Sequence, residues 1–183
     1  MDKLFIPKTH GCIVDDLYSI LSKVEKEKDL KRFNSKDELF EYLSTLTLNR
    51  IFLATHYNKD ERIVKFFKKN VTSELINAIS KCEFVYGFIC NGYHFLNTIE
   101  NLKFVSYSGY IPAIFGLKQI DTIILNLFES IFEYLQNETK NNSKSKYDVI
   151  LQLHESMVDD LKGNNRMSEA IFYQAWSELL VSK

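Results

Sequence analysis

The sequence has few residues that interrupt helices, with 6 Gly and 2 Pro among its 183 residues. A turn-rich β-sandwich needs such residues at most of its connections, so their scarcity argues against that class. Aromatic residues are abundant instead, with 14 Phe and 10 Tyr. Few breakers and many bulky side chains favour long helices around an aromatic core. The length suits one domain, and we assign all of residues 1–183 to it.

Charge of one sign is not in excess, because 23 Lys and Arg stand against 24 Asp and Glu. A dedicated nucleic-acid-binding protein normally carries a basic excess, so no nucleic-acid partner is expected. No apolar run is long enough to span a bilayer, and the first residues lack the basic and apolar regions of a signal peptide. We therefore expect a cytoplasmic protein without membrane insertion.

The sequence also lacks the common signatures of catalysis and metal binding. Its three cysteines, Cys12, Cys82 and Cys90, form no C-x-x-C pair, and we expect them to be reduced and structural. None of the four histidines stands in an H-x-x-x-H or Cys/His ligand arrangement. Glycine-rich phosphate loops and a nucleophile elbow are absent as well. The expectation is a protein that is not an enzyme and holds no metal and no cofactor.

Apolar residues recur at helical spacing along most of the chain. This spacing predicts helices over residues 13–33, from 36 to about 56, 72–96, 118–136, 147–163 and 167–181. Ser35 and Glu38 have the spacing of a capping box at the start of the second helix. Residues 137–146 are polar and form a connection within the domain. The predicted fold class is all-α, a single-domain bundle of six to eight helices without strands.

Aromatic residues gather between Tyr86 and Phe115, a stretch that also contains Gly87, Gly92 and Gly109. Tyrosine is costly in a core unless its hydroxyl finds a partner, so several tyrosines beside glycines favour an apolar pocket with a few polar groups. Ordinary core packing is the alternative. The predicted ligand-binding residues in this stretch are Tyr86, Phe88, Tyr93, Tyr107, Tyr110 and Phe115.

Phe115-Gly116-Leu117 precedes a long apolar helix, and Ala175-Trp176 lies in the last predicted helix. These two features resemble the globin superfamily, specifically its sensor-globin branch. In that branch the proximal histidine lies four residues before the Gly-Leu pair, where this chain has Pro112. The resemblance therefore implies a haem-free relative. It also places Tyr57 at the distal position, as a further ligand-binding residue.

The resemblance implies a regulatory or signalling domain, without catalysis, that binds a small apolar ligand or a protein partner. One alternative is a haem-binding sensor with His94 or His154 as the axial ligand. A second alternative is a helical interaction module, similar to Bcl-2-like proteins, that holds a partner helix in a groove. A homodimer is also compatible with the apolar closing helices.

Overall fold

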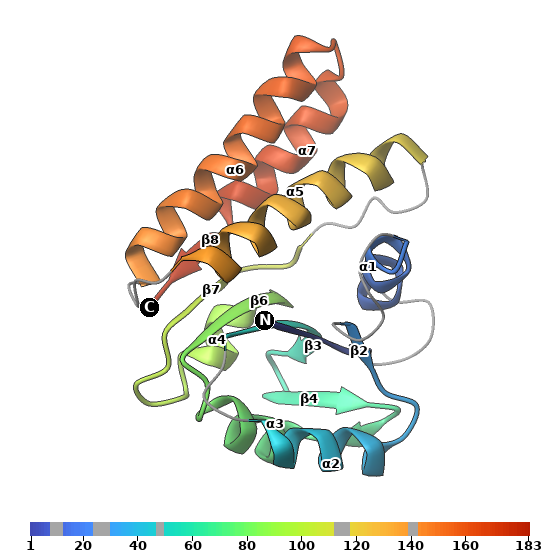
Figure 1. Ribbon diagram of the computed structural model, residues 1–183, viewed down its shortest axis with the longest axis vertical. Coiled ribbons are helices and arrows are strands. Elements are labelled where there is room, and N and C mark those ends of the chain that lie inside the picture. The colour runs from blue at the N-terminus through green and yellow to red at the C-terminus, as the bar shows by residue number, and fades with distance from the viewer. Residues whose placement is uncertain (8–12, 24–29, 47–49, 112–117, 139–142) are drawn as a thin grey trace.

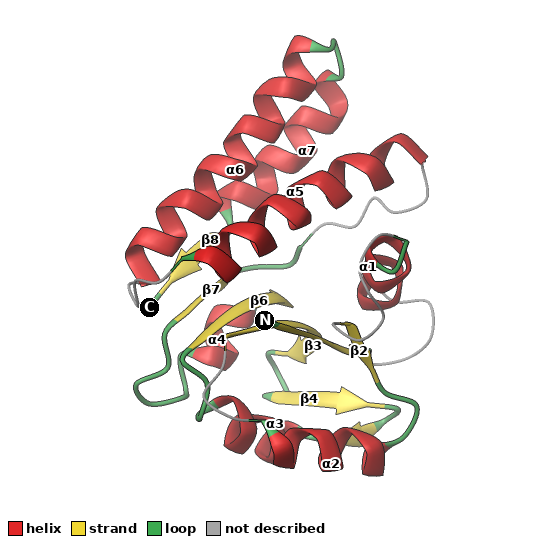
Figure 2. Cartoon of the chain, viewed as in Figure 1, coloured by secondary structure: helices red, strands yellow, loops and turns green. Residues whose placement is uncertain are grey.

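A computed structural model shows that the chain is an α/β protein built on one mixed sheet of eight strands (Figures 1 and 2). The structure describes residues 1–7, 13–23, 30–46, 50–111, 118–138 and 143–183. Helices cover both faces of the sheet (Figure 1). This arrangement is typical of doubly wound proteins.

The strands follow the order β2-β1-β3-β6-β7-β8 across the sheet. The parallel strands are β1 (Asp2–Ile6), β2 (Leu30–Arg32), β3 (Arg50–Asn58), β6 (Phe84–Cys90) and β7 (Phe104–Tyr107). Strand β8 (Leu180–Ser182) pairs antiparallel with β7. A short hairpin of β4 (Ile63–Phe66) and β5 (Lys69–Asn70) extends from the end of β3.

The helices form two layers. One face of the sheet carries α1 (Ile13–Leu21), α5 (Lys118–Asn137), α6 (Ser143–Gly163) and α7 (Met167–Glu178). The other face carries α2 (Lys36–Thr45), α3 (Thr72–Ile79) and α4 (Gly92–Leu96). Helices α6 and α7 form a hairpin that extends well beyond the sheet (Figure 1).

Alternating side chains of the central strands divide the core in two. In β3, Phe52 belongs to the cluster under α1 and α5, and its ring lies 5.0 Å from that of Phe132. Its neighbours Ile51 and Leu53 belong to the cluster on the α2 and α3 side. Every residue of β6 is buried, because both faces of this strand are covered.

The capping box of α2 is confirmed, with one difference in its partners. The Glu38 amide donates to Ser35 Oγ at 3.1 Å, as expected. The Glu38 carboxylate, however, accepts from the Asn34 amide at 2.8 Å and not from that of Ser35. The long buried helix predicted over 118–136 and the helix end at Gly163 are also present.

The all-α prediction is wrong. The second half of the helix expected over 13–33 contains β2, and the helix expected up to residue 56 ends at Thr45 and is followed by β3. The helix expected over 72–96 is divided into α3, β6 and α4. Strands buried on both faces read as continuous apolar runs without alternation, and such runs also satisfy helical spacing.

The fold also overturns the resemblance to globins and the functions drawn from it. A sheet of parallel strands replaces the bundle of six to eight helices, so neither a haem-free sensor globin nor a haem-binding one fits. The same sheet excludes the Bcl-2-like helical module. Ala175-Trp176 does lie in the last helix, where Trp176 packs in the core, but Phe115, Gly116 and Pro112 are outside the described residues.

Candidate active site

The carboxyl ends of the central strands form the part of this fold where a ligand site is expected. Strand β1 lies between β2 and β3. The connection from β1 to β2 places α1 on one face, and the connection from β3 to β6 places α3 on the other. The chain thus winds outward in both directions from the β1–β3 pair. In open α/β sheets of this kind, ligands bind beyond the carboxyl ends of the strands near that point.

A histidine and a cysteine occupy this edge on neighbouring strands. His56 in β3 and Cys90, the last residue of β6, are direct partners in the parallel ladder. Partners in such a ladder are about 4.8 Å apart across the strands and point to the same face. The two partners Phe52 and Tyr86, four residues earlier in each strand, confirm this register, because their rings lie 5.5 Å apart. The imidazole and the thiol therefore project from adjacent strands on the same face of the sheet.

The Cys90 thiol is nearly enclosed and is held by a backbone donor. Its residue is 7% exposed, and Sγ accepts a hydrogen bond from the Ile111 amide at 3.3 Å. Burial raises the pKa of this thiol, while the Ile111 amide opposes the rise by favouring the thiolate. A thiol in this environment needs a neighbouring base to become a nucleophile. His56, which is half-buried on the neighbouring strand, is the candidate for this base.

The chain turns sharply directly after Cys90. Asn91 adopts a left-handed conformation, with φ at 55°, and its amide donates to the Gly109 carbonyl at 2.7 Å. Gly92 then starts α4, and a Cβ at this position would lie only 2.1 Å from Ser106 Oγ. Only glycine allows β7 to approach so closely. The strained turn fixes the position of Cys90, and strain of this kind concentrates at functional sites.

Asn91 adds an unusual polar group beside the thiol. The residue is 4% exposed, and its Nδ2 has no hydrogen-bond partner in the structure. Buried amide groups are normally paired, so an orphan donor needs an explanation. Its position next to Cys90 in the chain associates it with this site.

The sheet divides the aromatic residues predicted to bind a ligand between its two faces. Phe88, Tyr86 and Tyr107 lie in the core under α5, where the two tyrosine hydroxyls are 3.0 Å apart. Tyr57 lies on the opposite face and stacks on Phe95. The remaining predicted residues are Tyr93, which is half-buried in α4, Tyr110, which is 67% exposed, and Phe115, which is outside the described residues.

The two histidines considered as haem ligands differ in burial. His94 is exposed on α4. His154 of α6 is fully buried, and its Nε2 lies 3.4 Å from the Tyr107 hydroxyl. Burial lowers the pKa of His154 to about 4, so this side chain is neutral at pH 7. It ends a buried polar chain that runs from Tyr86 through Tyr107.

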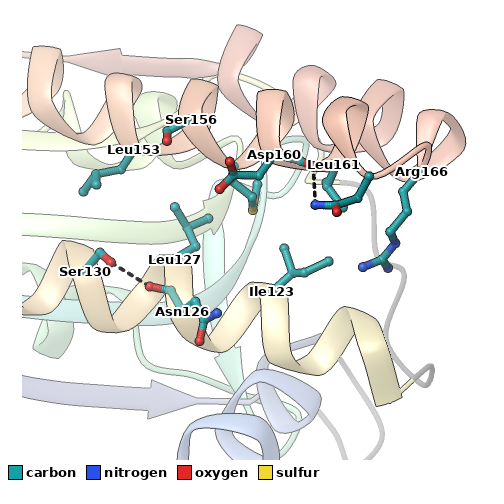
Figure 3. A pocket seen from close by; sticks show the side chains of 11 residues that line it. Ile123, Asn126, Leu127, Ser130, Leu153, Ser156, Asp160, Leu161 and Arg166 are labelled. Carbon is teal, nitrogen blue, oxygen red and sulfur yellow. Dashed lines mark hydrogen bonds between the residues drawn. The ribbon is translucent and has the colours of Figure 1, made fainter.

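A separate cleft lies between α5 and the α6–α7 hairpin (Figure 3). Its volume is about 330 Å³. Leu127 and Ile123 from α5 and Leu153 and Leu161 from α6 point into it (Figure 3). Arg166 lies at one end of the cleft (Figure 3), and its guanidinium pairs with Glu169 at 3.3 Å. The residues that line this cleft include no cysteine and no histidine.

The sequence analysis missed both residues of the Cys–His pair. It interpreted Cys90 as structural and placed His56 at the end of a helix. The available signal is that each residue ends an apolar run, in Ile51-Phe-Leu-Ala-Thr-His56 and in Phe84-Val-Tyr-Gly-Phe-Ile-Cys90. A catalytic cysteine and its histidine are adjacent in space and not in sequence, so no local motif would reveal them.

Two other classes of site find no support in the part of the chain that the structure describes. No helix there has the length and apolarity needed to cross a membrane. Nor do three His, Cys, Asp or Glu side chains come together there as ligands for a metal ion.

Comparison with known proteins gives this chain no relatives. No family model matches it, and neither a curated protein nor a solved structure does. The geometry of the site is therefore the basis for assigning a function.

Proposed function

We propose that this protein is a cysteine hydrolase that cleaves an amide or ester bond, with Cys90 as the nucleophile and His56 as the general base. The observation that carries the proposal is the direct pairing of these two residues at the carboxyl ends of adjacent central strands. The proposal departs from the expectation of a protein that is not an enzyme. That expectation rested on the absence of local motifs, and a Cys–His pair does not require one.

The reaction follows from the roles of the two side chains. The His56 imidazole accepts the thiol proton, and Sγ forms a bond to the carbonyl carbon of the acyl donor. The bond to the leaving amine or alcohol then breaks, and the leaving group takes the proton from His56. Water next gives a proton to His56 and attacks the thioester carbon. The carboxylic acid departs, and the Cys90 thiolate regains its proton.

Backbone geometry supports the nucleophile in this scheme. The Ile111 amide already donates to Sγ, so it stabilises the thiolate relative to the thiol. The left-handed turn at Asn91 holds the thiol at the end of the strand. A thiol that is already positioned loses less conformational entropy on reaching the transition state. Ile111 and Asn91 lie just beyond the carboxyl ends of β7 and β6, so both features belong to the connections at this edge of the sheet.

The first test is the chemical reactivity of two cysteines that are equally buried. Cys82 is 8% exposed, close to the 7% of Cys90, and the burial of Cys82 raises its pKa to about 11. In a Cys12→Ser background, iodoacetamide at pH 7 should alkylate Cys90 at least about tenfold faster than Cys82, as measured by peptide mass spectrometry. The His56→Ala variant should remove this difference. The variant His94→Ala, which changes an exposed histidine of α4, should retain it.

The second test is turnover of p-nitrophenyl acetate. The expected result is a burst of p-nitrophenolate equal to the enzyme concentration, followed by slower hydrolysis as the thioester deacylates. Cys82→Ala should keep the burst and His56→Ala should lose it. Equal alkylation of Cys82 and Cys90, together with hydrolysis no faster than that of the Cys90→Ala variant, would overturn the proposal.

A further inference from the structure

Tyr110 is the aromatic residue that departs most from the packing of this protein. Its side chain is 67% exposed, whereas most of the other described aromatic residues are buried or half-buried. Two other large apolar side chains among the described residues, Met167 and Ile171, are exposed, and both lie on α7. A single exposed apolar residue needs no explanation by itself. The position of Tyr110 in the fold, however, provides an explanation for its exposure.

Tyr110 follows β7 in a segment that runs directly beside the nucleophile. The residue before it, Gly109, accepts a hydrogen bond from the Asn91 amide at 2.7 Å. The residue after it, Ile111, donates to Cys90 Sγ at 3.3 Å. Tyr110 is therefore bracketed by bonds to Cys90 and to the residue that follows Cys90. Its backbone lies at the edge of the proposed active site.

The backbone of this segment is held firmly. The Ser108 amide donates to the Leu179 carbonyl at 2.8 Å. A Cβ at Gly109 would lie 2.9 Å from Leu179 Cδ2, so the turn packs tightly against the end of α7. An exposed tyrosine on a fixed backbone offers a large contact surface at a small cost in conformational entropy. This combination is typical of binding residues on a rigid scaffold.

We infer that Tyr110 is a specificity-determining residue, and that the acyl group cleaved at Cys90 carries an aromatic or large aliphatic side group that packs on the Tyr110 ring. The inference rests on the proposed function and names its substrate class. The adjacent residues Ser108, Gly109 and Ile111 carry no charge, so they present no ionic group to a substrate. An apolar side group gains contact area on the ring and loses water from both surfaces.

The test compares two esters that share one leaving group, p-nitrophenyl acetate and p-nitrophenyl 3-phenylpropanoate. In the wild type, kcat/KM should favour the phenylpropanoate. In Tyr110→Ala the ratio of the two kcat/KM values should fall about tenfold, the size expected for one aromatic contact. Tyr110→Phe should retain the ratio, because the ring and not the hydroxyl makes the contact. The matched control Ile171→Ala, an exposed apolar residue of α7, should leave both values unchanged.

A second measurement separates this inference from the proposed function. Phenacyl bromide and bromoacetamide both alkylate a thiol with loss of bromide, and only the first carries a phenyl ring. The ratio of their rates at Cys90 should fall in Tyr110→Ala and stay unchanged in Ile171→Ala. Absence of ester hydrolysis in the wild type would contradict the hydrolase, whereas an unchanged ratio in both assays would overturn the role of Tyr110.

Discussion

Strand β6 has a cysteine near each end, and the two ends of the sheet are built differently around them. At the amino ends of the strands, near Cys82, polar side chains pair with other groups of the protein. Arg50 pairs with Glu83 at 3.1 Å and donates to the Leu135 carbonyl at the end of α5. The Tyr42 hydroxyl donates to the Asp2 carboxylate at 2.6 Å. This edge satisfies its own polar groups and holds elements together.

At the carboxyl ends, near Cys90, the residues have features that are typical of a binding site. The turn at Asn91 is strained, an amide donor is left without a partner, and an aromatic ring is exposed. Strained backbone residues cluster at functional sites. The described residues thus pair their polar groups at one edge of the sheet and leave a strained turn and an unpaired donor at the other.

The largest effect that we expect is the loss of activity when the thiol of Cys90, at the carboxyl ends of the strands, is removed. Cys90→Ala should reduce kcat for p-nitrophenyl acetate by about 10³-fold or more, because the variant lacks the thiol that forms the acyl intermediate. Cys82→Ala at the opposite edge should leave kcat unchanged. Burst kinetics and circular dichroism on both variants check the result. Equal losses in both folded variants would contradict the division between the edges.

A histidine away from both edges provides a pH-dependent contrast. The core lowers the pKa of His154 from 6.5 to about 4, because it excludes the charged form. Between these values the unfolded chain binds a proton and the folded chain does not, so stability is retained above pH 6.5 and falls as the pH drops toward 4. The total loss is about 3 kcal/mol. Urea unfolding across this range should show the slope, and His154→Leu should flatten it.

The amino edge should respond in stability alone. Arg50→Ala removes the bonds to Glu83 and to the end of α5, and it should lower the free energy of unfolding by about 2 kcal/mol. The rate at which iodoacetamide alkylates Cys90 in the folded protein should stay the same. Urea unfolding and peptide mass spectrometry measure the two quantities. A slower alkylation of Cys90 in this variant would show that the two edges are coupled.

The smallest expected difference is in the pH dependence of alkylation of Cys82 and Cys90. Burial, reinforced by the charge of Asp2, raises the pKa of Cys82 to about 11. The alkylation rate of Cys82 should therefore rise with pH until about 11. Cys90, beside an imidazole and an amide donor, should reach its plateau at a lower pH. Coincident pH profiles would indicate that His56 does not act on Cys90.

The sequence contains some of this fold in local form. Ser35 and Glu38 predicted the start of α2, and the apolar residues from Ile124 to Leu135 predicted the buried α5. Strands β3 and β6 were missed because both are buried on two faces, which removes the alternation that marks a strand. Their apolar runs fit helical spacing equally well. Fourteen phenylalanines reinforced that interpretation, since aromatic residues pack in either kind of core.

The candidate site depends on information that no local pattern contains. His56 and Cys90 become neighbours only through the pairing of β3 with β6, and that pairing follows from the connection through α3. Once the strands are placed, the pairing of His56 with Cys90 near their carboxyl ends identifies the candidate site. Tyr110 was included among the predicted ligand-binding residues because of its type. Its exposure and its place beside Cys90 come from the structure alone.

The hydrogen bond between Ser108 and Leu179 connects the α6–α7 hairpin to the backbone segment that contacts the thiol. Leu179 follows the last turn of α7, and Ser108 lies three residues before the amide that binds Sγ. The other end of the hairpin extends far from the sheet (Figure 1). One short backbone segment therefore joins this projecting hairpin to the candidate site.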